Sequence, residues 1–315
     1  MPKLRTLITG SIAYDTIMVF PDRFRNHLLA DQLHILNVCF LTPEMRREYG
    51  GTAGNIAYNL KLLGGEPLLM ATVGEDIQPY LERLDRLGIG QEHLMRVPGQ
   101  FTAQAFITTD LDDNQITAFH PGAMNFSHLN HITPRLGARL AIVGPDGKDG
   151  MLQHARECAR HGVPFLFDPG QGLPMFSREE LLEMVQLADY LAVNDYEGKL
   201  LEDKTGRTLA ELARELKALV ATLGAQGSVI LAGSERHEIP CVQAQAVLDP
   251  TGCGDAYRAG LLYGLARGWD WPSAGRLAAV LGAAKIAQRG AQNHHFTREE
   301  IEVRFRRAFG YSPWG

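Results

Sequence analysis

The sequence has few of the features that mark exported or membrane-spanning proteins. Its four cysteines, Cys39, Cys158, Cys241 and Cys253, show neither metal-type spacing nor a paired framework. No apolar run approaches 18 residues, and the N-terminal segment reaches polar and acidic residues before a hydrophobic signal core could form. We therefore expect reduced thiols and a cytoplasmic protein that does not interact with membranes.

The sequence also lacks a strong excess of charge of one sign. Its 31 Lys and Arg residues face 36 Asp and Glu residues, which gives a formal net charge of -5, and no basic block or arginine-rich stripe appears. We therefore expect no nucleic-acid partner. Because 45% of the 315 residues are hydrophobic, the chain can bury a large core. No composition shift marks a second domain, so we expect one α/β domain over residues 1–315.

Short apolar runs alternate with helical patterns along most of the chain. The apolar runs predict strands at residues 4–9, 67–73, 139–143, 163–168 and 190–194. The helical patterns predict helices at residues 55–63, 77–87, 151–160, 178–188 and 209–220. This alternation is typical of a doubly wound, mostly parallel sheet with helices on both faces.

Two segments, residues 34–49 and 101–120, interrupt this alternation because they lack helical periodicity. The second contains Asp112-Asp113-Asn114 between two strand-like runs, which predicts a hairpin. We interpret the two segments as a small β-rich lid inserted into the main domain at about residues 16–49 and 99–121. Two long surface loops are the alternative.

The heptapeptide at residues 249–255, DPTGCGD, contains two glycines and ends on the carboxylate of Asp255, directly before an apolar helical stretch at residues 256–267. Glycines let backbone amides crowd around an anion, and the start of a helix adds a positive dipole end. The carboxylate stands where it can take a proton from a hydroxyl group. An ordinary helix cap by Asp255 explains the same residues, so the heptapeptide alone leaves both interpretations open.

Two further motifs follow predicted strands. Asn194 and Glu197 lie at a strand end and on a first helical turn, where they can address the water shell of a Mg²⁺ ion or form a capping box. The glycine-containing segment 222–227 lies between predicted strands at residues 219–222 and 228–231. It fits a loop that passes close to a nucleotide, and it equally fits a plain hairpin turn.

Two motifs in the correct order and spacing carry a family resemblance. DPTGCGDAYRAG at residues 249–260, together with GGTAGN at residues 50–55, resembles the paired signatures of the ribokinase family, also called the PfkB carbohydrate kinases. The correspondence covers almost the whole chain. Residues 10–15, Phe40-Leu41 and residues 119–124 are similar in particular to the bacterial adenosine kinases. The resemblance implies an ATP-dependent kinase that phosphorylates the 5′-hydroxyl of a ribonucleoside, with adenosine favoured, as in purine salvage.

The resemblance assigns the chemical step to the loop at residues 252–255. Asp255 would accept the proton of the attacking hydroxyl, and the backbone amides of Gly252, Cys253 and Gly254 would hold the negative charge of the phosphoryl oxygens. The Cys253 side chain is expected to act as a spacer, because only its backbone would face the anion.

The resemblance also assigns a donor end of the site. ATP would contact Asn194 and the loop residues Thr222, Gly224 and Gly227. Asn194 and Glu197 would hold Mg²⁺ through water molecules, because Mg²⁺ keeps its waters readily. A monovalent cation and the choice between ATP and GTP stay open.

At the acceptor end, the resemblance predicts residues that close on the ribose and the base: Asp15, Gly50, Gly51, Asn55, Phe119 and Gln171. The carboxylate of Asp15 can accept hydrogen bonds from two vicinal ribose hydroxyls, and the ring of Phe119 can stack on a purine.

The sequence departs from the adenosine kinases at two positions. Ala105 stands where a second lid aromatic is expected, with Phe101 and Phe106 nearby, and Gly172 replaces the second of two paired glutamines. A kinase for inosine, guanosine or cytidine is therefore an alternative, as are a sugar kinase of the family and a non-catalytic nucleoside-binding protein. The open face of the lid also suggests a homodimer.

Overall fold

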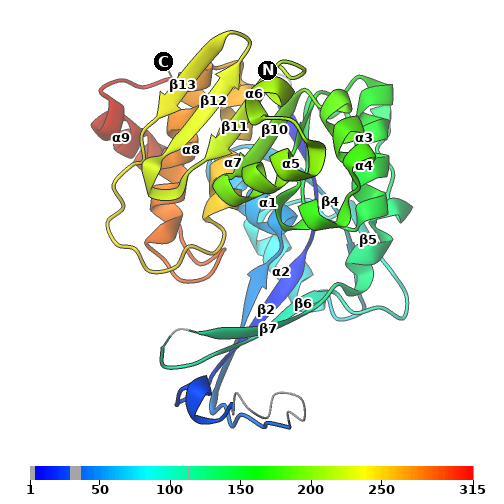
Figure 1. The fold of residues 1–315 in the computed structure, drawn as a ribbon, viewed down its shortest axis with the longest axis vertical. Coiled ribbons are helices and arrows are strands. Elements are labelled where there is room, and N and C mark those ends of the chain that lie inside the picture. The colour runs from blue at the N-terminus through cyan, green and yellow to red at the C-terminus, as the bar shows by residue number, and fades with distance from the viewer. Residues whose placement is uncertain (1–3, 29–36, 113, 315) are drawn as a thin grey trace.

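The computed structural model describes residues 4–28, 37–112 and 114–314, and within them a nine-stranded sheet forms the centre of the molecule (Figure 1). Its strands, in the order in which they lie side by side, are β13 (Glu235–Ile239), β12 (Ser228–Ala232), β11 (Ala218–Thr222), β10 (Tyr190–Asn194), β9 (Phe165–Phe167), β8 (Leu140–Val143), β1 (Arg5–Thr9), β4 (Glu66–Val73) and β5 (His93–Arg96). Only β11–β12 and β12–β13 pair antiparallel. The predicted mostly parallel sheet is confirmed.

Helices pack on both faces of this sheet. One hydrophobic core contains α1 (Thr52–Leu62), α2 (Gln78–Leu87), α7 (Cys253–Ala266), α8 (Trp271–Ile286) and α9 (Arg298–Phe309). The other contains α3 (Lys148–His161), α4 (Arg178–Leu187), α5 (Asp195–Thr205) and α6 (Leu209–Ala213). Successive strand residues enter opposite cores, as Leu7 and Ile8 do, because side chains alternate across a strand. The doubly wound arrangement is therefore confirmed.

One predicted helix is wrong in its extent. The helix expected at residues 209–220 ends at Ala213, and residues 218–222 form β11. The strands predicted at residues 219–222 and 228–231, the first of which overlapped that helix, are confirmed. Ala218, Leu219 and Val220 are fully buried between strands β10 and β12, where both faces of the sheet are covered. A continuous apolar run of this kind fits a buried strand as well as a helix, so periodicity alone did not separate the two.

A second, four-stranded sheet projects away from the large one (Figure 1). It is ordered β3 (Glu44–Gly50), β2 (Ala13–Val19), β6 (Ala103–Thr109) and β7 (Gln115–His120). The β2–β6 pair is parallel and the other two pairs are antiparallel. This sheet is the predicted β-rich lid, and its first strand begins at Ala13, earlier than expected. Of the two predicted lid segments, residues 34–36 and Asp113 lie outside the described residues.

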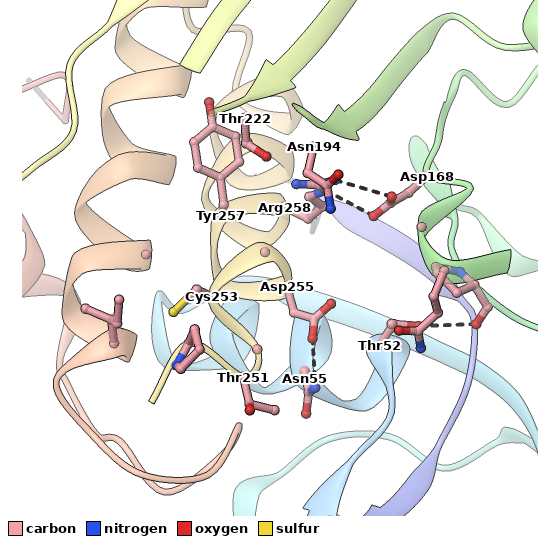
Figure 2. A pocket seen from close by; sticks show the side chains of 18 of the residues that line it. Thr52, Asn55, Asp168, Asn194, Thr222, Thr251, Cys253, Asp255, Tyr257 and Arg258 are labelled. Atoms are coloured by element: carbon pink, nitrogen blue, oxygen red, sulfur yellow. Dashed lines mark hydrogen bonds and ion pairs between the residues drawn. The ribbon is translucent and has the colours of Figure 1, made fainter. Parts of the chain in front are cut away.

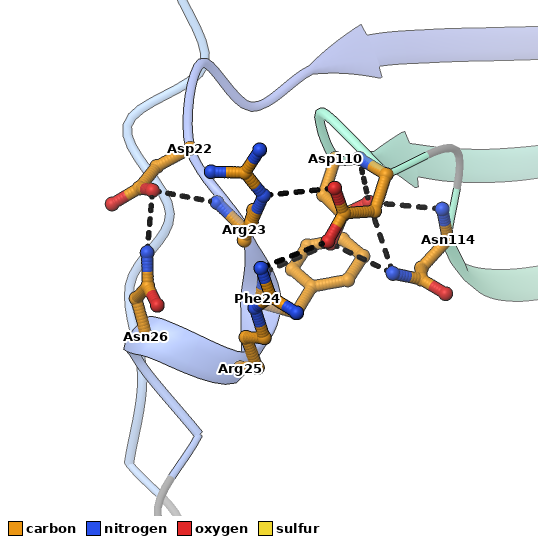
Figure 3. A network of polar contacts seen from close by, with 8 residues as sticks. Asp22, Arg23, Phe24, Arg25, Asn26, Asp110 and Asn114 are labelled. Carbon is orange, nitrogen blue, oxygen red and sulfur yellow. Dashed lines mark hydrogen bonds and ion pairs between the residues drawn. The ribbon is translucent and has the colours of Figure 1, made fainter.

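The predicted lid hairpin is confirmed, and Asp110 shapes its turn (Figure 3). One carboxylate oxygen of Asp110 accepts hydrogen bonds from the backbone amides of Asp112 and Asn114, both at 2.9 Å. The other accepts from the amide of Phe24 at 2.9 Å. Arg23 adds an ion pair to Asp112 at 2.8 Å. The hairpin is therefore tied to the segment that follows β2.

Candidate active site

A cavity of about 1250 Å³ lies between the inner face of the lid and the carboxyl ends of the large-sheet strands. Ligands of doubly wound sheets bind at this end of the strands. All predicted site residues except Gly50 line this cavity. Gly50 ends β3 behind Asp15, and a Cβ atom there would lie 2.7 Å from the Asp15 carboxylate, so its glycine makes room for that side chain.

The loop before α7 presents two unpaired backbone amides to the cavity. Gly252 caps the helix with a φ of 78°, and a Cβ atom on it would lie 2.9 Å from Ala291, so glycine is needed there on both counts. The Cys253 amide donates to the Pro250 carbonyl at 3.0 Å, whereas the amides of Gly252 and Gly254 have no protein acceptor among the described residues. Burial raises the pKa of the Cys253 thiol to about 11, which fits its expected role as a spacer.

Asp255 lies on the first turn of α7 with its carboxylate in the cavity (Figure 2). Burial raises its pKa to about 7, and Asp168 adds to this, while a hydrogen bond from Asn55 and the charge of Arg258 oppose it. The bond joins Asn55 Nδ2 to the carboxylate at 2.8 Å. A carboxylate with a pKa near 7 is suited to accept a proton at neutral pH.

A relay of hydrogen bonds holds Asn55 in the orientation that Asp255 requires. Gln292 Nε2 lies 3.0 Å from the side-chain oxygen of Asn55 and 2.7 Å from the Tyr80 hydroxyl. The Tyr80 hydroxyl donates to the Gly50 carbonyl at 2.8 Å. Because Gln292 donates to the Asn55 oxygen, the Asn55 nitrogen is left to face Asp255. The sequence did not point to Tyr80 or Gln292, since neither belongs to a motif.

Two other carboxyl groups at the cavity were also missed. Asp146 follows β8, is 2% exposed and has one oxygen without a hydrogen-bond partner. Burial raises its pKa to about 8, so the group is largely protonated at neutral pH and can donate a hydrogen bond. Asp168 follows β9 and pairs with Arg258 of α7 at 3.0 and 3.3 Å. In the sequence the only signal was their position, Asp168 at the end of one predicted strand and Asp146 shortly after another.

The lid contributes one row of side chains to the cavity. Asp15 of β2 lies opposite Ala105 of β6, and Ala105 lies opposite Phe119 of β7, so all three point to the same face of the sheet. Burial raises the pKa of Asp15 to about 6, with repulsion from Glu48 and Asp249 adding to it. Phe106, one position on, faces away from the cavity. Ala105 therefore faces the cavity in place of Phe106, and its small side chain leaves more space there than an aromatic ring would.

Asn194 and Glu197, at the predicted donor end, form the capping box that the sequence left open. The Asn194 side-chain oxygen accepts from the Glu197 amide at 2.7 Å, and the Glu197 carboxylate accepts from the Asn194 amide at 2.8 Å. Burial raises the pKa of Glu197, and Asp168 adds to this. The described residues hold no cluster of three His, Cys, Asp or Glu side chains around a metal position. One free Glu197 oxygen fits an ion that is bound through water and phosphates.

The segment predicted as a nucleotide loop is a turn between the antiparallel strands β11 and β12. Thr222 ends β11, and Gly224 and Gly227 have φ values of 56° and 86°. A Cβ atom on Gly227 would lie 2.1 Å from the Ile239 carbonyl, so the hairpin itself requires this glycine. All three residues nonetheless line the cavity. Beyond them the wall is apolar and includes Val242, Val247, Ala279 and Ile286.

Comparison with known proteins identifies the family. Residues 24–297 match the model of the pfkB family carbohydrate kinases, and the chain belongs to this family. It is an ATP-dependent kinase, as the sequence predicted. A search for membrane-spanning helices found none long and apolar enough among the described residues.

Several relatives named nucleoside kinase are similar to the chain. One from Methanocaldococcus jannaschii is 32% identical over 271 residues, which are 85% of this chain and 89% of the relative. One from Methanothermobacter thermautotrophicus is 32% identical over 313 residues, which are 98% of this chain and 97% of the relative. The structure of Burkholderia thailandensis nucleoside kinase in complex with inosine is 56% identical, has a TM-score of 0.89 and covers 98% of this chain and all of that one.

Proposed function

We propose that the protein transfers the γ-phosphate of ATP to the 5′-hydroxyl of a purine ribonucleoside. The observation that carries the proposal is the row of Asp15, Ala105 and Phe119 across the cavity from Asp255. One wall then carries the Asp15 carboxylate for the ribose hydroxyls and the Phe119 ring for the nucleobase. The opposite wall carries Asp255, which can accept the proton of the attacking hydroxyl. The inosine complex of the Burkholderia thailandensis relative supports the same substrate class.

In the proposed reaction, Asp255 accepts the proton of the 5′-hydroxyl while that oxygen attacks the γ-phosphorus. The bond between the γ-phosphorus and the bridging oxygen breaks, and its electron pair leaves with ADP. The free amides of Gly252 and Gly254, at the start of α7, face the charge that shifts onto the phosphoryl oxygens. Closure of the lid excludes water and so suppresses hydrolysis of ATP.

ATP would lie along the cavity from Asn194 to the turn of Thr222, Gly224 and Gly227, with its adenine ring against the apolar wall. Asn194 and Glu197 would hold Mg²⁺ through water. When bound, the ion neutralises phosphate charge. Activity in potassium chloride compared with activity in choline chloride tests whether the enzyme requires a monovalent cation. Activity with ATP compared with activity with GTP tests the preference for the phosphate donor.

A substrate panel tests the proposal. Adenosine, inosine, guanosine, cytidine and free ribose are compared by kcat/KM with ATP as donor. Adenosine is the nucleoside that the sequence favours, and inosine is favoured by the relative and by the space beside Ala105. We expect the purine ribonucleosides to exceed ribose by at least about 100-fold, because ribose forgoes burial of the base. Equal or better use of ribose would instead make the protein a sugar kinase.

Phe119 provides a matched test of base stacking. Phe119→Ala should raise the KM for the nucleoside roughly 10-fold, since a stacking contact contributes about 1–1.5 kcal/mol. Leu111→Ala is the control, because Leu111 is an exposed apolar residue in the turn of the same lid hairpin and does not line the cavity. If both substitutions change KM equally, Phe119 does not form the wall of the base site.

Asp15 provides a test of ribose recognition. Asp15→Asn should weaken binding of the ribonucleoside, and the loss should shrink for the 2′-deoxynucleoside, which lacks one of the hydroxyls that the carboxylate accepts from. Equal losses for both substrates would remove Asp15 from the ribose site.

We also propose that the protein acts in the cytoplasm, where its free thiols would stay reduced.

We further propose that two copies of the chain associate through the outer face of the lid. The exposed side chains of Met45, Phe106 and Ile116 share the lid face opposite the cavity. An apolar face of this kind is stabilised when a second copy covers it. Light scattering after size-exclusion chromatography should give twice the mass of one chain, and a monomer at micromolar concentration would refute the dimer.

A further inference from the structure

The charges that line the active-site cavity are strongly unbalanced. Six carboxyl side chains line it: Asp15, Asp146, Asp168, Asp195, Glu197 and Asp255. Among the described residues of this lining, Arg258 is the only Lys, Arg or His. A phosphoryl-transfer site must stabilise negative charge on the transferring group, and positive charge does this most directly. Arg258 is therefore the one fixed cation available among the described residues of this surface.

Arg258 of α7 lines the cavity. It is on the same face of α7 as Asp255, because residues three apart share a helix face. Figure 2 shows it between Asp255 and Asn194, which is the interval that a transferring phosphoryl group has to occupy. The guanidinium also reaches the helix start, since Arg258 Nη1 lies 3.9 Å from the position of a Cβ atom on Gly254.

The hydrogen bonds of Arg258 leave one edge of the guanidinium free. Arg258 Nε and Nη2 donate to the two oxygens of Asp168 at 3.0 and 3.3 Å. No protein acceptor among the described residues takes a hydrogen bond from Nη1. Asp168 thus fixes the plane of the guanidinium, and Nη1 points toward the loop with the free Gly254 amide. A planar, preorganised donor of this kind suits phosphate oxygens.

Stability does not explain this ion pair. The side chains of Arg258 and Asp168 are 5% and 8% exposed, so both charges lose most of their hydration. Replacing a buried ion pair by apolar residues of similar size is often neutral or stabilising. The burial of this pair is therefore weak evidence for a role in folding, whereas a charge in a water-poor site interacts strongly with a reacting phosphoryl group.

We propose that Arg258 is a catalytic residue, whose Nη1 donates a hydrogen bond to a non-bridging oxygen of the transferring phosphoryl group while Asp168 holds the guanidinium in place. No proton leaves Arg258, since the hydroxyl proton passes to Asp255. This role rests on the proposed function in one respect, that the protein transfers a phosphoryl group from ATP. It does not depend on which nucleoside accepts that group.

The decisive variant is the apolar pair Arg258→Met with Asp168→Val, which keeps similar volumes and removes both charges. We expect it to fold, to bind the nucleoside with an affinity within about threefold of wild type and to lose on the order of 10²-fold or more in kcat. Binding of ADP with aluminium fluoride and nucleoside, which imitates the planar phosphoryl group, should weaken far more than binding of ADP alone. Arg156→Gln is the control, because Arg156 makes a two-bond pair with Glu183 outside the cavity.

Several results would overturn the proposal. One is a folded apolar-pair variant with kcat within about threefold of wild type. Another is equal weakening of ADP with and without aluminium fluoride. If the apolar pair does not fold, Arg258→Gln and Arg258→Lys decide by the same two measurements, and failure of all three to fold would assign the ion pair to the fold. A wild-type protein that phosphorylates no nucleoside would refute the proposed acceptor, while the aluminium fluoride measurement with ADP would still test Arg258.

Discussion

Replacing Asp255 by Asn should stabilise the ligand-free protein while it removes turnover. Burial raises the pKa of Asp255 to about 7, whereas the unfolded chain has the ordinary value near 3.8. Between these pH values the folded protein binds more protons than the unfolded chain, so the stability of wild type falls as pH rises from about 4 to about 7. At roughly 1.4 kcal/mol per pH unit, ionisation of Asp255 costs about 4 kcal/mol by pH 8. The asparagine side chain of the variant carries no charge and still accepts a hydrogen bond from Asn55.

Urea denaturation of both proteins at pH 5 and pH 8 measures this effect. The free energy of unfolding of Asp255→Asn, relative to wild type, should increase by roughly 2–3 kcal/mol between the two pH values. Asp15 and Asp146 also have raised pKa values, but they titrate in both proteins and largely cancel in the difference. If the difference in the free energy of unfolding between the two proteins does not change with pH, the Asp255 carboxylate is not buried as described.

Three further outcomes are expected. In wild type, kcat/KM should fall about tenfold per pH unit between about pH 7 and pH 6, and more steeply below about pH 6, where Asp15 also becomes protonated. Asn55→Leu should move the upper part of this limb to higher pH, because the hydrogen bond that lowers the pKa of Asp255 is lost, and an unmoved limb would contradict the contact. Gly51→Ala should destabilise the fold by roughly 2 kcal/mol or more in thermal denaturation, because the φ of Gly51 is 83° and a Cβ atom there would lie 2.5 Å from the Ser11 carbonyl. Gly64→Ala is the control: Gly64 has a φ of 76°, but a Cβ atom there would meet no atom within 4 Å, so this variant should lose about 1 kcal/mol. Removal of Mg²⁺ with EDTA should abolish turnover, and added Mg²⁺ should restore it.

The sequence predicted those parts of the site that short motifs carry. The loop at residues 249–255 and the glycines at residues 50–55 each hold several functional groups within a few residues, so their composition identifies them. The two segments are far apart in the chain, yet Asn55 and Asp255 meet at 2.8 Å. The alternative interpretations also proved compatible with a site, because Asn194 and Glu197 form a capping box and still line the cavity.

Contacts between isolated residues were not predictable from the sequence. Gln292 orients Asn55 from 237 residues further along the chain and is itself held by Tyr80, and each is an ordinary polar residue in its own segment. The pairing of Asp168 with Arg258 likewise depends on how β9 and α7 meet. Sequence patterns show how buried and exposed residues alternate within one helix or strand. They do not show which helices and strands pack together, and that packing decides these contacts.

The most direct test of the proposed chemistry is the ATP-dependent phosphorylation of inosine and adenosine by wild type and by Asp255→Asn, with the product identified by mass spectrometry and ³¹P NMR. Wild type should form the 5′-monophosphate. The variant should bind the nucleoside nearly as well and lose on the order of 10³-fold in kcat. A variant that keeps most of its turnover, or a wild type whose product carries phosphate on another hydroxyl, would contradict the account.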